Sequence, residues 1–295
     1  MPPPTMPTER PLCPPPKPPS APRARAPSGA TDCHFHIFGP YDRFPLSPGR
    51  SYDAPEAGIE AYRAMAGVLG LSRQIVVQAS IFGTDNACTL DAVAAFGRAN
   101  ARAIAVIDDA VTAPELAKLE AGGVVGVRFN AVSGNGTPLD QIEALAARIA
   151  PLGWHLQLYV DGAALIALAP RLSALPVPVV LDHMGGIRAA AGTEDPAFQA
   201  LRRLLDTGRA WVKLCGYRSS SGPPYADLLA PARALIAHAP ERCLWGTDWP
   251  HPHLEGRAMP DDGVLLDLLY DWAGTDAAVR RILVDNPAIL YGFDR

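Results

Sequence analysis

Eight short apolar runs alternate along this chain with longer stretches rich in alanine and leucine. Apolar runs of strand length are typical of parallel strands buried on both faces, and the stretches between them have helical spacing. We predict strands at 32–36, 74–79, 103–107, 124–129, 154–160, 177–182, 210–215 and 242–246. We predict helices at 57–69, 86–99, 113–121, 139–150, 162–174, 196–207 and 226–238, and more within 263–292. This α/β pattern predicts a single (β/α)8 barrel of the TIM type, with its active site at the carboxyl ends of the strands.

Composition divides the chain into two parts. Residues 1–29 are rich in proline, most densely at 13–19, and proline fixes φ and removes backbone donors. We therefore expect 1–29 to be disordered or to wrap around the barrel domain, which we place at 30–295. A proline-rich segment can also recruit a proline-recognising domain, so a non-catalytic binding protein is one alternative.

Charge and cysteine content restrict the partners and the compartment. The net charge is -4 and the isoelectric point is about 6.0, which gives no electrostatic attraction to nucleic acid or anionic membrane. The five cysteines are scattered and have no C-x-x-C spacing, which indicates a reducing compartment. We find neither a membrane-spanning apolar run nor a signal peptide, so we predict a cytoplasmic protein. The sequence does not indicate the oligomeric state.

Polar side chains gather where the predicted strands end. His34 and His36 lie two residues apart, so both point to one side of the first strand and Phe35 points to the other. His183 follows the sixth strand and Asp248 follows the eighth. Because the carboxyl ends of parallel strands meet at one rim of a barrel, we expect three imidazoles and one carboxylate around one cavity.

Such a group has two chemical uses. It can bind a divalent metal, with Asp248 as a ligand or as the base for a metal-bound water. Alternatively, the imidazoles donate hydrogen bonds to an oxygen that gains charge while Asp248 deprotonates an attacking water. Both alternatives predict hydrolytic attack on a carbonyl carbon. Ser80 and Cys215 are weaker candidates, because Ser80 lacks a G-x-S-x-G context and no histidine is assigned beside Cys215.

Two further expectations concern the surroundings of this group. We expect the apolar neighbours Trp245 and Trp249 to raise the pKa of Asp248, so that activity falls on acidification. We interpret the remaining polar residues near strand ends as structural or as ordinary surface groups: Asp182, Arg188, His238 and His253.

The order and spacing of these motifs resemble the amidohydrolase superfamily, and more narrowly the branch that contains 2-pyrone-4,6-dicarboxylate lactonase. The resemblance covers most of residues 31–292. It is carried by His34-x-His36, the L-D-H-M-G of 181–185, the W-G-T-D-W-P-H-P of 245–252, Phe38-Gly39-Pro40, residues 77–86, Arg128-Phe129-Asn130 and Asn286-Pro287. It implies a hydrolase of the carboxylic ester type that opens a lactone in the catabolism of aromatic or sugar acids.

The resemblance also implies roles for individual residues. His34, His36 and His183 would polarise the lactone carbonyl, and Asp248 would activate water. The substrate pocket would be lined by Tyr52, Ser80, Arg128, Tyr159 and Arg218. Because the dicarboxylate lactonase is regarded as independent of added metal while its relatives bind zinc or manganese, we expect either no required cofactor or one divalent metal. That metal would be held by His34, His36 and Asp248.

The departures from this branch concern the substrate. Gly134 and Gly186 stand where the dicarboxylate lactonase has arginines, and Arg188 compensates only if its loop turns inward. A lactone with one anionic group, or with its charge placed differently, is therefore an alternative: 4-sulfomuconolactone, a carboxymuconolactone or a sugar-acid lactone. Arg128 and Arg218 still indicate an anionic ligand. A second alternative is a zinc-dependent decarboxylase of an aromatic acid, because the same superfamily contains such lyases.

Overall fold

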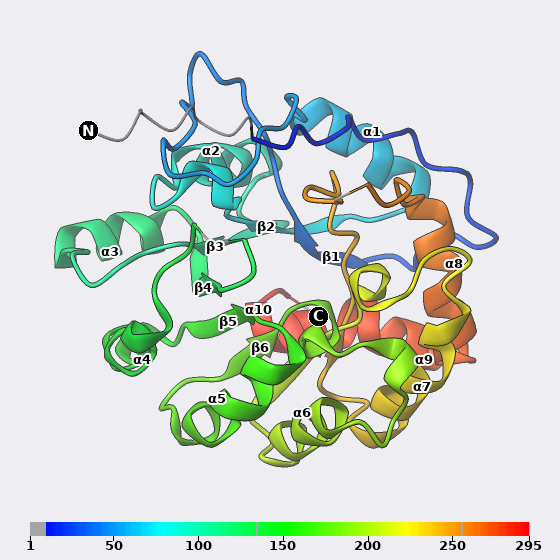
Figure 1. The fold of residues 1–295 in the computed structure, drawn as a ribbon. Helices are drawn as coiled ribbons and strands as arrows, with labels where there is room; N and C mark the ends of the chain where they lie inside the picture. The colour runs from blue at the N-terminus through cyan, green and yellow to red at the C-terminus, as the bar shows by residue number, and fades with distance from the viewer. Residues whose placement is uncertain (1–9, 134, 255, 295) are drawn as a thin grey trace, which may run out of the picture.

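Eight parallel strands follow one another in chain order around the centre of the molecule (Figure 1). The computed structural model describes residues 10–133, 135–254 and 256–294. The strands are β1 (Thr31–Phe35), β2 (Arg73–Val77), β3 (Ala101–Ala105), β4 (Val124–Asn130), β5 (His155–Tyr159), β6 (Val179–Leu181), β7 (Ala210–Lys213) and β8 (Cys243–Leu244). The predicted (β/α)8 barrel is confirmed.

The barrel closes between its first and last strands. The backbone N–H of Cys33 donates to Trp245 O at 3.0 Å, and that of Asp248 donates to His34 O at 2.7 Å. The predicted eighth strand, 242–246, is longer than the observed β8. Beyond Leu244 the chain leaves strand geometry and bends across the rim, reaching a positive φ of 64° at Asp248.

Helices between the strands cover the outside of the barrel (Figure 1). They are α1 (Ile59–Leu69), α2 (Ala87–Phe96), α3 (Ala113–Ala121), α4 (Ile142–Ile149), α5 (Gly162–Ala174), α6 (Pro196–Asp206), α7 (Leu229–His238), α8 (Asp262–Ala273), α9 (Asp276–Arg280) and α10 (Asn286–Tyr291). Their starts follow from the sequence: Asp161, Asp195 and Asp261 accept hydrogen bonds from the first turns of α5, α6 and α8. In the described part of the chain, no helix is both long and apolar enough to span a membrane.

The lower half of the barrel interior is apolar. Side chains such as Val77, Ile104 and Val180 fill it, and Tyr291 of α10 packs beneath them. The polar inward-facing residues lie above this layer, toward the carboxyl ends of the strands. The core therefore supports the rim on which the predicted site residues stand.

His155 is an exception within this lower layer. It is 2 % exposed, its Nε2 has no hydrogen-bond partner, and its ring lies edge-on to Tyr291. Burial lowers the pKa of His155 from 6.5 to about 3. The unfolded chain therefore binds more protons than the folded chain below pH 6.5, and stability is lost as the pH falls from 6.5 toward 3.

We expect His155→Leu to remove part of this acid sensitivity. Between pH 7 and pH 5, the wild-type free energy of unfolding should fall by about 2 kcal/mol more than that of the variant. Urea unfolding at both pH values measures the difference. Parallel pH dependences in the two proteins would contradict the assignment.

The N-terminal segment lies against the barrel from residue 10 onward. Cys13 and Asp53 join it to the loop that precedes α1, through Cys13 N–H to Asp53 O (2.8 Å) and Asp53 N–H to Pro11 O (3.0 Å). Further along, Ser20 N–H donates to the Asp261 carboxylate at 2.9 Å. Gly263 allows this approach, because a Cβ there would lie 2.1 Å from Ser20 O. Figure 1 shows the segment in dark blue beside α1 and α8.

We expect removal of residues 1–16 to loosen the loop that carries Tyr52. The free energy of unfolding should fall by about 1–3 kcal/mol, because two backbone hydrogen bonds and the burial of Cys13 are lost. The Asp53 amide loses its acceptor, so hydrogen exchange over residues 47–55 should accelerate. Removal of residues 1–9 alone is the matched control. Equal exchange in both truncated proteins would show that residues 10–16 do not restrain the loop.

Candidate active site

Strand β1 presents two histidines to the barrel interior. The ring centroids of His34 and His36 are 5.1 Å apart, whereas Phe35 points outward and stacks on Tyr62 of α1 at 3.7 Å. The predicted alternation is confirmed. The Nδ1 of His36 lies 2.8 Å from Val77 O, a carbonyl oxygen that can only accept a hydrogen bond. His36 Nδ1 therefore carries the proton, and its Nε2 presents a lone pair to the site.

Asp248 lies opposite these histidines. Its Oδ2 accepts hydrogen bonds from Tyr217 Oη at 2.6 Å and Arg218 Nε at 2.5 Å. Its Oδ1 lies 3.5 Å from the Nε2 atoms of both His34 and His36. One oxygen of the carboxylate is thus fixed, and the other faces two imidazoles.

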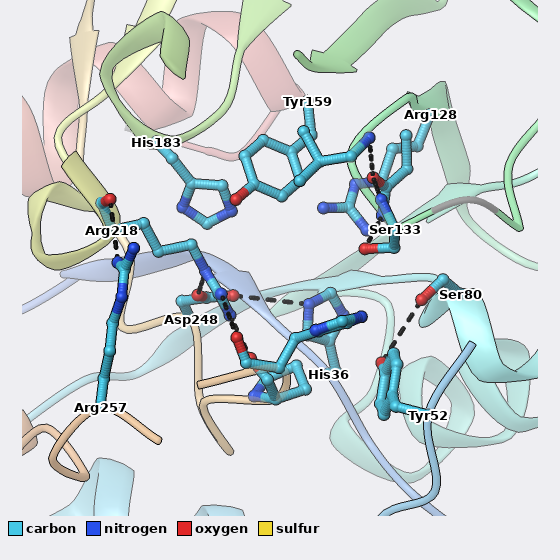
Figure 2. A pocket seen from close by; sticks show the side chains of 14 residues that line it. His36, Tyr52, Ser80, Arg128, Ser133, Tyr159, His183, Arg218, Asp248 and Arg257 are labelled. Atoms are coloured by element: carbon cyan, nitrogen blue, oxygen red, sulfur yellow. Dashed lines mark hydrogen bonds and ion pairs between the residues drawn. The ribbon is translucent and has the colours of Figure 1, made fainter. Parts of the chain in front are cut away.

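His183 completes the predicted group. It begins a tight turn after β6 with a positive φ of 48°, and its ring centroid is 4.9 Å from that of His34. Tyr159 lies edge-on to it at 4.4 Å. The structure therefore brings together the four residues expected at the rim, and Figure 2 shows three of them around one cavity.

A buried network of charges lies beneath this group. Asp182 Oδ1 is 3.1 Å from His34 Nδ1 and 3.3 Å from Lys213 Nζ. Its Oδ2 accepts hydrogen bonds from Arg128 Nε at 3.1 Å and Gln157 Nε2 at 3.0 Å. Lys213 Nζ also donates to Gln157 Oε1 at 2.7 Å. Asp182 is thus held by two cations and an amide, and in turn orients His34.

The proton on His34 follows from this network. Asp182 and Lys213 both approach Nδ1, at 3.1 and 3.3 Å. The carboxylate is the nearer group and is ionised, so Nδ1 donates to Asp182 and Nε2 keeps its lone pair. Asp182, which we interpreted from the sequence as structural or as an ordinary surface group, is buried and orients His34. Lys213 and Gln157 were not identified from the sequence.

Neighbouring charges decide the ionisation of the two buried aspartates. Burial acts to raise the pKa of Asp182, but Lys213 and His34 hold it well below its usual range. Burial also acts to raise the pKa of Asp248, but Arg218, together with His183, holds it well below its usual range. The expected rise in the pKa of Asp248 is therefore wrong, because an adjacent guanidinium outweighs the apolar surroundings.

The imidazoles respond to burial in the opposite direction. Burial lowers the pKa of His34 well below 6.5 and also lowers that of His36. It lowers the pKa of His183 to about 4. All three rings are therefore neutral at physiological pH, as hydrogen-bond donors or metal ligands require.

Three lone pairs converge in the site with no described donor between them. They belong to His34 Nε2, His36 Nε2 and Asp248 Oδ1, and the first and last of these atoms are buried without a hydrogen-bond partner. The two distances from Asp248 Oδ1 to the histidine nitrogens, both 3.5 Å, are long for hydrogen bonds. They match the roughly 3.4 Å expected between two ligand atoms that are each about 2.1 Å from one tetrahedral zinc. The residues present therefore fit one divalent metal ion.

A cavity of about 150 Å³ lies above the histidines and Asp248 (Figure 2). It is lined by all five side chains expected to contact substrate: Tyr52, Ser80, Arg128, Tyr159 and Arg218. Ser80 Oγ donates to Tyr52 Oη at 3.4 Å, which joins two of its walls. His36, His183 and Asp248 also line the cavity, whereas His34 lies beneath them. The expected pocket residues therefore surround one space.

The two expected anion-binding arginines differ in what they offer. Arg218 donates through Nε to Asp248, through Nη2 to Pro252 O at 2.7 Å and through Nη1 to His253 O at 3.5 Å. Arg128 donates through Nε to Asp182, and no described residue accepts from its terminal nitrogens. Arg128 is therefore available to an anion in the cavity, whereas Arg218 mainly holds Asp248.

Several lining residues were missed or misassigned. Asn130, Ser133 and Arg257 were not predicted, and His253 was interpreted as an ordinary surface group. His253 lies on the cavity wall, with its ring centroid 4.8 Å from that of Tyr52. Its place directly after the W-P-H-P segment was the available signal.

Arg188 does not replace the missing arginines. It is exposed in a separate groove between the starts of α5 and α6, beside Asp161 and Asp195. Gly186 has a positive φ of 70°, and a Cβ there would lie 1.9 Å from Val160 O. This backbone therefore accepts no side chain at that position. Gly134 lies outside the described residues.

The model of an amidohydrolase family matches residues 31–293 of this sequence. The chain belongs to the amidohydrolase family. The resemblance found in the sequence is thus confirmed, and the amidohydrolase matches its relatives over almost their full length.

Three curated relatives are similar to this amidohydrolase. The 2-pyrone-4,6-dicarboxylate hydrolase of Comamonas testosteroni is 39% identical over 92% of this chain and 93% of the relative. The 4-sulfomuconolactone hydrolase of Hydrogenophaga intermedia is 40% identical over 90% and 89%. The D-galactarolactone isomerase of Agrobacterium fabrum is 37% identical over 92% and 94%.

The fold also matches a crystal structure from Acinetobacter baumannii with a TM-score of 0.79 and 26% identity. That protein is named "probable 2-pyrone-4,6-dicarboxylic acid hydrolase" and holds citric acid. The match covers 90% of the amidohydrolase and all of the neighbour.

Proposed function

We propose that this amidohydrolase opens a small anionic lactone by hydrolysis. The observation that carries the proposal is the carboxylate of Asp248, ionised and fixed through Oδ2, with Oδ1 placed between two neutral imidazoles at a cavity wall. Two relatives are by name hydrolases of lactone substrates, and a third is by name a lactone isomerase.

The proposed reaction uses water as the nucleophile. Asp248 removes a proton as the water oxygen bonds to the carbonyl carbon, and the ring C–O bond then breaks. The leaving oxygen takes up the proton that Asp248 removed from the water, and the products are a carboxylate and a hydroxyl or keto group. Neutral His183 lines the cavity, and its ring would donate a hydrogen bond to the carbonyl oxygen. A divalent metal bound by His34, His36 and Asp248 would polarise the carbonyl and lower the pKa of the water.

The anionic character of the substrate rests on Arg128. Arg128 is 4 % exposed and forms an ion pair with Asp182. Lys213 forms an ion pair with the same carboxylate, so two cations face one anion. One positive charge is therefore left over beside the cavity, and an anionic group of the substrate would balance it. Three candidates besides 2-pyrone-4,6-dicarboxylate remain: 4-sulfomuconolactone, a carboxymuconolactone and a sugar-acid lactone.

The other functional hypotheses receive less support. Membership of an enzyme family argues against the non-catalytic binder. None of the three relatives is by name a decarboxylase. A lactone isomerase is a second candidate, because the relative from Agrobacterium fabrum covers nearly the whole chain.

A cytoplasmic location remains a prediction, supported by five cysteines that are all free and buried.

A lactone panel in ¹⁸O-labelled water tests the proposal. We expect purified protein to consume at least one anionic lactone, seen as loss of ring absorbance, with one labelled oxygen in the product by mass spectrometry. Conversion without label would indicate isomerisation. Carbon dioxide release from an aromatic acid would indicate the lyase, and a panel without any turnover would overturn the proposal.

A further inference from the structure

The cavity has a third arginine that the family resemblance does not predict. Arg257 follows β8 on the loop after Gly256, and it lines the cavity together with Arg128 and Arg218. Its Nη1 donates to Arg218 O at 3.3 Å, and it makes no ion pair with a described carboxylate. The side chain is exposed, so its charge is available at the mouth of the cavity.

The three arginines are in different electrostatic states. Arg218 is neutralised by Asp248 at 2.5 Å. Arg128 and Lys213 together face the single carboxylate of Asp182, which leaves one positive charge at the inner wall. Arg257 adds a second uncompensated charge at the mouth. Arg128 at the inner wall and Arg257 at the mouth therefore favour a ligand with two negative charges.

These two charges are also well separated. Figure 2 shows Arg128 and Arg257 on opposite sides of His36 and Asp248, the pair that faces the reacting group in the proposed function. A lactone that places one anionic group on Arg128 would therefore extend its other end past Asp248 toward Arg257. His253 and Tyr52 form the wall beside Arg257, and these three residues also line a second cavity next to the first.

We infer that Arg257 binds a second anionic substituent of the lactone and so selects dianionic over monoanionic substrates. This inference rests on the proposed function and assigns a specificity-determining residue to it. It also accounts for the departures from the dicarboxylate lactonase, because Gly186 cannot hold a side chain and Arg188 lies in another groove. Arg257, on the loop after β8, supplies the positive charge that these two positions do not.

Ligand binding tests Arg257 without requiring turnover. Isophthalate and benzoate are non-hydrolysable rings with two carboxylates and one. We expect wild-type protein to bind isophthalate more tightly by isothermal titration calorimetry. Arg257→Gln should weaken isophthalate binding about three- to fivefold and leave benzoate binding unchanged, because the ion pair between Arg257 and the second carboxylate is exposed. Arg257→Lys should retain part of the preference, and Arg188→Gln is the matched control with no change.

The outcomes separate this inference from the proposed function. Equal isophthalate affinity in wild type and Arg257→Gln overturns the role of Arg257, as does an equal loss for benzoate and isophthalate. A wild-type protein that opens no lactone overturns the proposed function, whatever the binding result. In kinetics with an active lactone, Arg257→Gln should raise KM for a dianionic substrate and change kcat by less than twofold.

Discussion

We expect Asp248→Asn to reduce kcat by about 10³-fold. An amide is not basic enough to take a proton from water, and it is a poorer metal ligand than a carboxylate. The substitution keeps the shape of the side chain, so Tyr217 and Arg218 retain an oxygen acceptor. Steady-state kinetics with the best lactone of the panel give the loss, and inductively coupled plasma mass spectrometry gives the metal content of both proteins.

Asp267→Asn is the control for this variant. Asp267 is a carboxylate of α8 that pairs with Arg23 at 3.3 Å, and it has no role in the proposed reaction. Its activity should equal that of wild type. If Asp248→Asn retains a kcat within tenfold of wild type, Asp248 is neither base nor essential ligand.

We expect Asp182→Asn to lower the free energy of unfolding by about 3–5 kcal/mol. Asp182, Lys213 and His34 are all 0 % exposed, and Arg128 is 4 % exposed. Removing the one anion leaves two buried cations facing each other without compensation. Asp267→Asn again serves as the control, because an exposed pair contributes less than about 1 kcal/mol. Urea unfolding at neutral pH measures both variants.

A double-mutant cycle separates the charge effect from a packing effect. Lys213→Met alone should also destabilise, because it leaves Gln157 without its 2.7 Å donor. Asp182→Asn combined with Lys213→Met removes one charge of each sign, so the loss should be smaller than the sum by about 1–3 kcal/mol. An additive result would show that Asp182 and Lys213 are not coupled.

The residues at the strand ends could be predicted because a barrel has only one rim at which parallel strands end. His34, His36, His183 and Asp248 follow that rule, and the period-two alternation in β1 fixed the direction of both histidines. Those signals are local. They require only the order of the strands and the alternating direction of side chains along one strand.

The buried network could not be predicted in the same way. Asp182, Lys213, Gln157 and Arg128 come from four neighbouring strands or their ends, and their contacts depend on the register of each pair. The orientation of Arg218 depends on the 3-10 turn Gly216–Ser219, which no pattern in the sequence predicted. That orientation decides the direction of the Asp248 pKa shift. The predicted rise in this pKa was therefore wrong, although the predicted position of Asp248 beside the histidines agrees with the structure.

Gly186 lies so close to Val160 O that it has no room for a side chain, and this restricts how the substrate preference can be engineered. A designer who copies an arginine from a dicarboxylate-cleaving homologue into this position would have to rebuild the β5–α5 connection first. The loop after β8 is the more tractable place to retune preference, because Arg257 is exposed there. Arg257 is the position to vary, since Gly256 has a positive φ of 79° that strains any other residue. Laboratory selection for new lactones should therefore accumulate changes there before it touches residues near Gly186.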